Sequence, residues 1–147
     1  MPSTIRLHRV IKAPPERIYR AFTNPDAWSK WLPPHGFIGK VHEMEPRVGG
    51  RYRMSFINMS NDAGHSFGGE YLELVPNEKL RYTAAFDDAN LPGQMQTTIT
   101  LREVFCGTEF TAVQEGIPDM IPPEMCYLGW QESLQLLAQL VEANVPG

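Results

Sequence analysis

Polar side chains on otherwise apolar strand faces are the residues of this sequence that could do chemistry. Arg9 interrupts one apolar face, and Glu70, Tyr82 and Gln114 are further candidates for an inward orientation. A carboxylate in an apolar cavity has a raised pKa, so Glu70 could exchange protons with Tyr82 or Arg9. Arg9 and Glu70 could instead form a structural ion pair or anchor a ligand, because an unpaired buried charge costs on the order of several kcal/mol.

The orientation of Glu70 depends on the phase of the strand predicted over 67–75. Successive residues of a strand face opposite sides of the sheet. If Leu72 faces the core, Glu70 does so too, whereas an inward Tyr71 would bring Glu73 with it. The sequence leaves both phases open.

Motifs for metal, phosphate or nucleophile chemistry are missing from the sequence. The four histidines lack a spacing such as His-x-x-x-His, so we expect no metal site and place them at the surface. Both Gly-Gly pairs precede strands rather than helix N-termini, and no Gly-x-Ser-x-Gly motif occurs. We therefore expect no cofactor, and the sequence favours binding over catalysis. The histidines are His8, His35, His42 and His65.

Composition excludes several classes of protein. A formal net charge of -4 without a basic stripe argues against nucleic-acid binding. No apolar run approaches the ~20 residues of a membrane span, and no signal peptide opens the chain, so we expect a cytoplasmic protein. Cys106 and Cys126 form neither a disulfide framework nor a metal cluster, and we expect buried free thiols. The length of 147 residues suits one domain, 1–147.

Alternating strands and three helices must position the inward side chains. Pro14 and Pro15 start a short helix that contains Phe22, and Asn24 is the predicted N-cap of a second helix that ends near Trp31. Turn residues then separate six strands in antiparallel order. The predicted strands are 4–12, 37–44, 51–58, 67–75, 79–87, 94–104 and 108–115.

A long helix is predicted over 122–144 and organises the rest of the fold. Its polar residues fall in one narrow sector, and apolar residues cover well over half of the circumference, more than the ~100° stripe of an ordinary surface helix. Such a helix needs apolar partners on both flanks. A sheet curved around it would supply them.

Strand alternation identifies the side chains that should face this helix and so could line a ligand cavity. Packing alone is the simpler interpretation of any one of these apolar residues. The candidates on the strands are Tyr52, Met54, Phe56, Leu72, Tyr82, Phe86, Met95, Ile99 and Phe110, beside Arg9 and Glu70. The candidates on the long helix are Trp130, Leu134 and Leu137.

Two tryptophans lie three residues apart in the second short helix. Trp28 and Trp31 could gate the entry of a ligand, or they could form a hydrophobic plug between helix and sheet. The plug is the simpler interpretation.

Several short sequence segments, in this order and spacing over nearly the whole chain, resemble the START-like or helix-grip (SRPBCC) superfamily. The closest resemblance is to the branch named after the C-terminal domain of the activator of the heat-shock-protein-90 ATPase. The segments are Arg9-Val10-Ile11-Lys12-Ala13-Pro14, Trp28-Ser29-Lys30-Trp31, Gly49-Gly50-Arg51-Tyr52, Gly69-Glu70-Tyr71-Leu72-Glu73 followed by Pro76, Leu80 and Tyr82, and Gly129-Trp130.

The resemblance implies an α+β, helix-grip fold: a seven-stranded antiparallel sheet curved around the C-terminal helix, with two short helices between the first two strands. It implies a cavity between sheet and helix, where members of the wider superfamily carry lipids, polyketides or hormones.

Three functions follow as hypotheses. The first is binding of a small, largely apolar molecule, with Arg9 or Glu70 as its polar anchor. The second is a protein-interaction or co-chaperone-like module with a chaperone or other protein as partner, and a homodimer is a further option. The third is an acid-base lyase or cyclase that acts in the same cavity.

Overall fold

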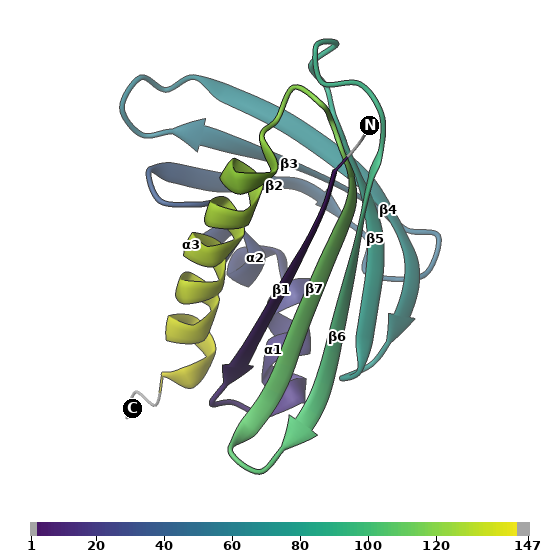
Figure 1. The fold of residues 1–147 in the computed structure, drawn as a ribbon, viewed down its shortest axis with the longest axis vertical. Coiled ribbons are helices and arrows are strands. Elements are labelled where there is room, and N and C mark those ends of the chain that lie inside the picture. Colours follow the sequence, from purple (N-terminus) through teal and green to yellow (C-terminus); the bar gives the residue numbers. More distant parts are fainter. Residues whose placement is uncertain (1–2, 144–147) are drawn as a thin grey trace.

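The computed structural model describes residues 3–143, which form seven strands and three helices. The strands form one antiparallel sheet in the order β1-β7-β6-β5-β4-β3-β2. The sheet curves, and all three helices lie on its concave side, with α3 beside the edge strand β1 (Figure 1). The elements are β1 (Ser3–Ile11), α1 (Pro15–Thr23), α2 (Pro25–Trp31), β2 (Phe37–Met44), β3 (Arg51–Asn58), β4 (Gly64–Val75), β5 (Lys79–Phe86), β6 (Met95–Val104), β7 (Gly107–Ile117) and α3 (Pro123–Glu142).

This architecture confirms the predicted fold class, including the two short helices between the first two strands. Local sequence explains where the helices begin. Proline occupies the first position of each helix, where its missing N–H costs no hydrogen bond. The Asn24 side chain caps α2 by accepting a hydrogen bond from the Ala27 N–H at 3.0 Å.

Contacts in the second half of α3 fix this helix on the sheet. Leu134, Leu137 and Val141 are buried in the core, and the Arg17 guanidinium donates to the Val141 carbonyl oxygen at 2.8 Å. Further up the helix, Ser133 donates to the carbonyl oxygen of Leu32, the residue after α2, at 2.5 Å. The helix is therefore tied to both short helices.

The first half of α3 is less enclosed than its sequence predicts. Met125, Tyr127 and Leu128 are exposed, as is Leu140 near the other end. The expectation of apolar partners on both flanks is wrong for these residues, because the sheet curves around one side of the helix only. The helix ends at Glu142, and the predicted last residue, Asn144, lies outside the described residues.

A β-bulge in β4 decides the phase that the sequence left open. Tyr71 pairs with Tyr82 and is buried, but the register shifts by one residue before Glu73. Tyr71 therefore faces the core before the bulge, and Leu74 packs against the core after it. Glu70 is exposed on the outer face, so its predicted inward orientation is wrong.

An unusual contact crosses β4 just before that bulge. Tyr52 on β3 lies opposite Gly69 on β4, and its hydroxyl donates to the carbonyl oxygen of Thr83 on β5 at 2.6 Å. The Glu70 N–H donates to the Thr83 hydroxyl at 2.9 Å instead of to a backbone carbonyl. The Tyr52 side chain can span the middle strand because Gly69 has no side chain there.

We expect Gly69→Ala to destabilise the protein by about 2–3 kcal/mol. A Cβ at Gly69 would overlap the Thr83 carbonyl oxygen that accepts the Tyr52 hydrogen bond, so the backbone would have to shift. Urea denaturation measures the free energy of unfolding. The matched control is Gly129→Ala, which also replaces a glycine by alanine but lies in a helix. Its new Cβ meets no atom within 4 Å. Equal stability of the two variants would contradict this account of Gly69.

Candidate functional site

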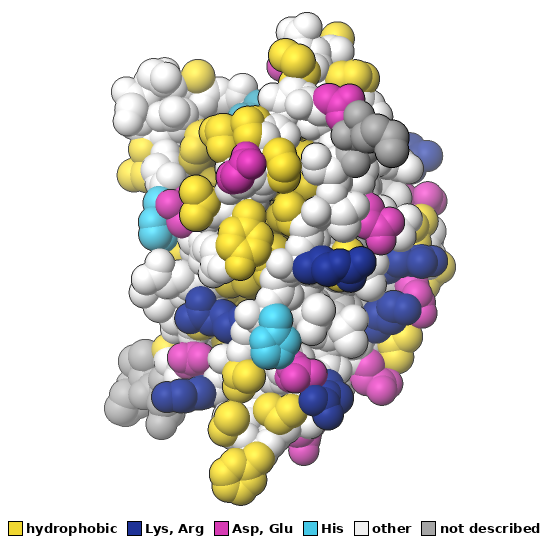
Figure 2. Space-filling view, in the orientation of Figure 1, with side chains coloured by type: hydrophobic (Ala, Val, Ile, Leu, Met, Phe, Trp, Pro, Cys, Tyr) yellow, Lys and Arg dark blue, Asp and Glu magenta, His cyan; other side chains and the backbone are white. Residues whose placement is uncertain are grey.

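A cavity of about 490 Å³ lies between the concave face of the sheet and the first half of α3. Its wall comes from α2, from strands β2 to β7 and from α3, while the edge strand β1 contributes nothing. Loop residues such as Pro34, Leu91 and Ile121 complete it. Hydrophobic side chains also gather on the surface beside this half of α3 (Figure 2).

Seven of the residues predicted to bind a ligand line this cavity. They come from α2, β3, β5, β6 and α3, so alternation identified inward positions on several separate strands. These residues are Trp28, Tyr52, Phe56, Tyr82, Phe86, Met95 and Trp130.

The other predicted site residues lie outside the cavity wall. Met54, Ile99, Phe110, Leu134 and Leu137 are buried in the packed core, where strand or helix periodicity cannot separate them from lining residues. Leu72 is half-buried at the β4 bulge, outside the core.

The two charged candidates do not meet. Arg9 shares the inner face of β1 with Ile11 and is half-buried, but it does not reach the cavity wall. Glu70 is exposed on the outer face of β4, where its Cα partner is Arg51. The ion pair between Arg9 and Glu70, one of the two alternatives left open by the sequence, is therefore not formed, and Glu70 as a ligand anchor in this cavity is wrong.

The two tryptophans of α2 have different environments. The Trp31 indole N–H donates to the Ala21 carbonyl oxygen at 2.8 Å, and its ring packs edge-on against Phe22, which is the structural plug. Trp28 lines the cavity and packs edge-on against Tyr52 and Tyr82. With 1% of its surface exposed, Trp28 forms the wall and not an entrance gate.

Four lining residues form a polar row along the cavity wall, and hydrogen bonds join three of them. The Trp130 indole N–H donates to the Gln114 side-chain oxygen at 3.2 Å, and the Gln114 amide nitrogen donates to the Thr97 hydroxyl at 3.1 Å. Tyr82 lies next to Thr97, its Cα partner on the adjacent strand. The row therefore runs from α3 across β7 and β6 to β5 in a mostly apolar wall.

Sequence reasoning found only part of this row. Gln114 followed from the alternation of Phe110 and Ala112, and Thr97 lies between two residues predicted to face inward, Met95 and Ile99. Thr97 was missed because a threonine in a strand is ordinarily read as a β-forming residue.

Other lining residues had weaker signals. Phe67 belongs to the strand whose phase was ambiguous, and Leu91 and Ile121 come from loops. His65, predicted to be a surface residue, is partly exposed but also lines the cavity.

The wall carries almost no charge. Burial lowers the pKa of His65, whose ring lies 5.7 Å from the Phe56 ring centroid, so its imidazole is neutral near pH 7. Burial also raises the pKa values of Tyr52 and Tyr82, and both phenols stay protonated. The carboxylate of Asp88, an exposed loop residue, is the remaining charge among the lining residues.

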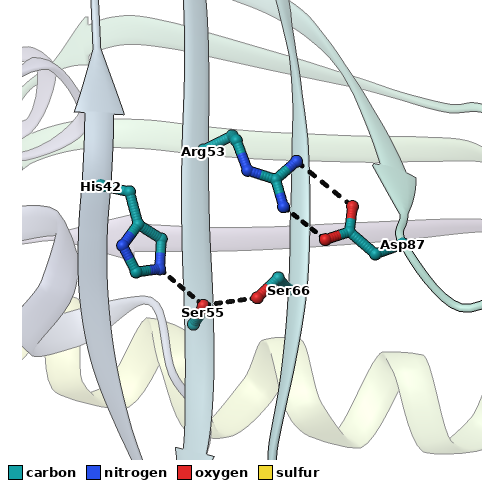
Figure 3. A network of polar contacts seen from close by, with 5 residues as sticks. All are labelled: His42, Arg53, Ser55, Ser66 and Asp87. Carbon is teal, nitrogen blue, oxygen red and sulfur yellow. Dashed lines mark hydrogen bonds and ion pairs between the residues drawn. The ribbon is translucent and has the colours of Figure 1, made fainter.

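A second polar group lies on the outer face of the sheet (Figure 3). The His42 Nε2 atom is 2.7 Å from the Ser55 hydroxyl, which is 2.6 Å from the Ser66 hydroxyl. Arg53 forms an ion pair with Asp87 beside them and holds the pKa of that carboxyl below its ordinary value.

This serine and histidine pair joins neighbouring strands of the sheet. Within residues 3–143, His42 has no second hydrogen-bonding partner that would orient its ring as a general base. Neither Ser55 nor His42 lines the cavity. The network satisfies the buried Ser55 hydroxyl and connects β2, β3 and β4.

The cysteines differ from the expectation of two buried thiols. Cys106 is exposed in the turn between β6 and β7, because the tip of this hairpin has no covering element. Cys126 is half-buried and lines the cavity. In the described part of the chain, no group of three or more metal-ligating side chains occurs, and no helix is long and apolar enough to cross a membrane.

Comparison with known proteins gives a clear family match. The family model described as Activator of Hsp90 ATPase homolog 1-like protein matches residues 12–142. None of the curated proteins matches the chain.

Solved structures show the same fold. A crystal structure of a Chromobacterium violaceum protein is 62% identical, covers 98% of this chain and 100% of its own, and superposes with a TM-score of 0.96. A Rhodobacter sphaeroides protein is 20% identical, with 95% and 92% coverage and a TM-score of 0.82. The solution structure of an AHSA1-like protein from Aeromonas hydrophila is 19% identical, with 95% and 92% coverage and a TM-score of 0.77.

We expect the alkylation rate of Cys126 to keep rising above about pH 8.5, the pKa of an ordinary cysteine. Burial raises the pKa of this thiol, so a smaller fraction is the reactive thiolate at any given pH. Iodoacetamide labelling of a Cys106→Ser variant, followed by mass spectrometry, measures the rate. The double variant Cys106→Ser, Cys126→Ser gives the background. A rate that levels off below about pH 8.5 would contradict a buried thiol.

Proposed function

This chain belongs to the family of Activator of Hsp90 ATPase homolog 1-like proteins, and from that premise we propose that it binds a small, largely apolar molecule. The observation that carries the proposal is the cavity of about 490 Å³ between the sheet and α3. Its volume falls within the roughly 300–1,000 Å³ of small-molecule sites. Its wall combines many aromatic and aliphatic side chains with one polar row, the composition typical of such sites.

Gly129 helps to explain why this space is open. It lies in α3 and lines the cavity, and a Cβ built on it would meet no atom within 4 Å. A helical glycine costs about 1 kcal/mol relative to alanine, so a larger residue would both favour the helix and fill the space. Glycine at this position instead leaves the space beside the helix unfilled.

An acid-base enzyme is not supported by the same geometry. The mechanism considered from the sequence required Glu70 inside the cavity, and Glu70 is exposed on the opposite face of the sheet. The two phenols that line the wall, Tyr52 and Tyr82, have raised pKa values because they are buried, which makes them poor proton donors and bases near pH 7.

A protein-interaction module would be supported by a large exposed apolar patch together with a filled core. Exposed apolar residues do occur around the start of α3, among them Met120, Met125 and Leu128. Met125 also lines the cavity, so this patch continues into its wall. Because the interior is open, ligand binding accounts for more of the structure than a docking surface alone.

We expect Gly129→Phe to weaken binding of the neutral fluorescent probe N-phenyl-1-naphthylamine by about 10-fold or more, equivalent to about 1.4 kcal/mol. The new ring would occupy space that the probe needs, without displacing any existing atom within 4 Å of the added Cβ. Probe fluorescence, titrated against protein, measures the dissociation constant.

The matched control is Gly129→Ala, which adds one methyl group at the same position. It should bind the probe within about 2-fold of the unmodified chain and should be as stable or more stable. Thermal unfolding of both variants shows that the fold persists. Unchanged binding by a folded Gly129→Phe would count against the cavity as the site.

A further inference from the structure

We propose that the cavity selects neutral molecules that carry a carbonyl or hydroxyl oxygen, and that Gln114 and Tyr82 bind this oxygen. Such molecules would bind more tightly than hydrocarbons or carboxylates of the same skeleton. This inference rests on the proposed function and concerns which ligand that site accepts. Its basis is the direction and number of hydrogen bonds in the polar row of Tyr82, Thr97, Gln114 and Trp130.

Trp130 fixes the orientation of the Gln114 amide. An indole N–H can only donate, so the atom of Gln114 that it contacts at 3.2 Å is the side-chain oxygen. The amide nitrogen therefore points towards Thr97, whose hydroxyl it reaches at 3.1 Å. This nitrogen has two hydrogens and uses one of them. Within residues 3–143 the second has no partner, and Gln114 lines the cavity.

Thr97 and Tyr82 leave a second donor. The two residues are Cα partners on adjacent strands, and their hydroxyl groups have two hydrogens between them. Even a hydrogen bond from one hydroxyl to the other would use only one of these hydrogens. Neither hydroxyl donates to any other group among the described residues. Thr97 is completely buried, and 4% of the Tyr82 surface is exposed, so bulk water does not reach the pair freely.

Two unmatched donors side by side suit one acceptor oxygen. A carbonyl oxygen has two lone pairs and can accept from both the Gln114 N–H and a hydroxyl of the pair. A hydrocarbon in the same place would leave these buried donors without partners, which lowers affinity.

The charges of the cavity wall disfavour a ligand that carries a carboxylate. No lysine or arginine lines the cavity, and His65 is neutral near pH 7 because burial lowers its pKa. Asp88, in the same wall, adds a negative charge. A carboxylate would lose its hydration without gaining a cation, so neutral donors alone would have to compensate.

The experiment compares three ligands that share a naphthalene ring: 2-acetylnaphthalene, 2-ethylnaphthalene and 2-naphthoate. Isothermal titration calorimetry near neutral pH measures each dissociation constant. We expect the ketone to bind about 3- to 10-fold more tightly than the hydrocarbon, the range of one or two neutral hydrogen bonds. We expect 2-naphthoate to bind at least about 10-fold more weakly than the ketone, because its charge is not compensated.

Two variants locate the acceptor site. Gln114→Met keeps the length of the side chain and removes its donors, so the preference for the ketone over the hydrocarbon should fall to the part that Tyr82 and Thr97 supply. Tyr82→Phe removes one hydroxyl of the pair and should abolish part of the same preference. The control is Gln96→Met on β6, next to Thr97 but on the opposite face, where the preference should be unchanged.

The outcomes separate this inference from the proposed function. If none of the three ligands binds, both fail. If the hydrocarbon or the carboxylate binds as tightly as the ketone, the cavity stands as a binding site and the acceptor preference is overturned. A ketone preference that survives undiminished in both Gln114→Met and Tyr82→Phe would also overturn it, because the oxygen would then be bound elsewhere.

Discussion

The attachment of α3 at its second half is the constraint on which the rest of the structure depends. Arg17 of α1 binds the Val141 carbonyl near the end of the helix, and Ser133 binds the Leu32 carbonyl at its middle. Between these points the helix buries leucines in the core. The half that precedes Ser133 buries Trp130, whose indole N–H donates to Gln114, but it leaves Met125 and Leu128 exposed, and the cavity lies under it. Space remains under this half because fewer of its side chains pack into the core.

Much of the fold could be predicted because it depends on local patterns. Alternation in β3, β5 and β6 is regular, so it correctly gave the facing of Tyr52, Tyr82 and Met95. The proline and asparagine signals likewise gave the starts of the helices. Each of these signals lies within one element and needs no knowledge of the element that packs against it.

The cavity wall could be predicted only in part, for two physical reasons. A bulge changes the facing of every later residue in a strand, and the sequence of β4 contains no unambiguous mark of it. Counting back by simple alternation from the residues after the bulge therefore placed Glu70 on the wrong face. Lining and core residues also have the same chemistry. Met95 lines the cavity while Ile99, on the same face of β6, is packed in the core, and the sequence of the strand alone does not separate the two.

Proximity of reactive side chains does not by itself indicate function in this fold. The His42 and Ser55 pair has the distance of a nucleophile and base, yet it lies on the outer face of the sheet, away from the cavity. The polar row has no strong acid or base, but it borders open space and has donors left over. A hydrogen-bonding group whose partners are all supplied by the protein stabilises the fold. One whose partner is not supplied is available to a ligand, and this difference is why the proposed binding site is the cavity and not the outer network.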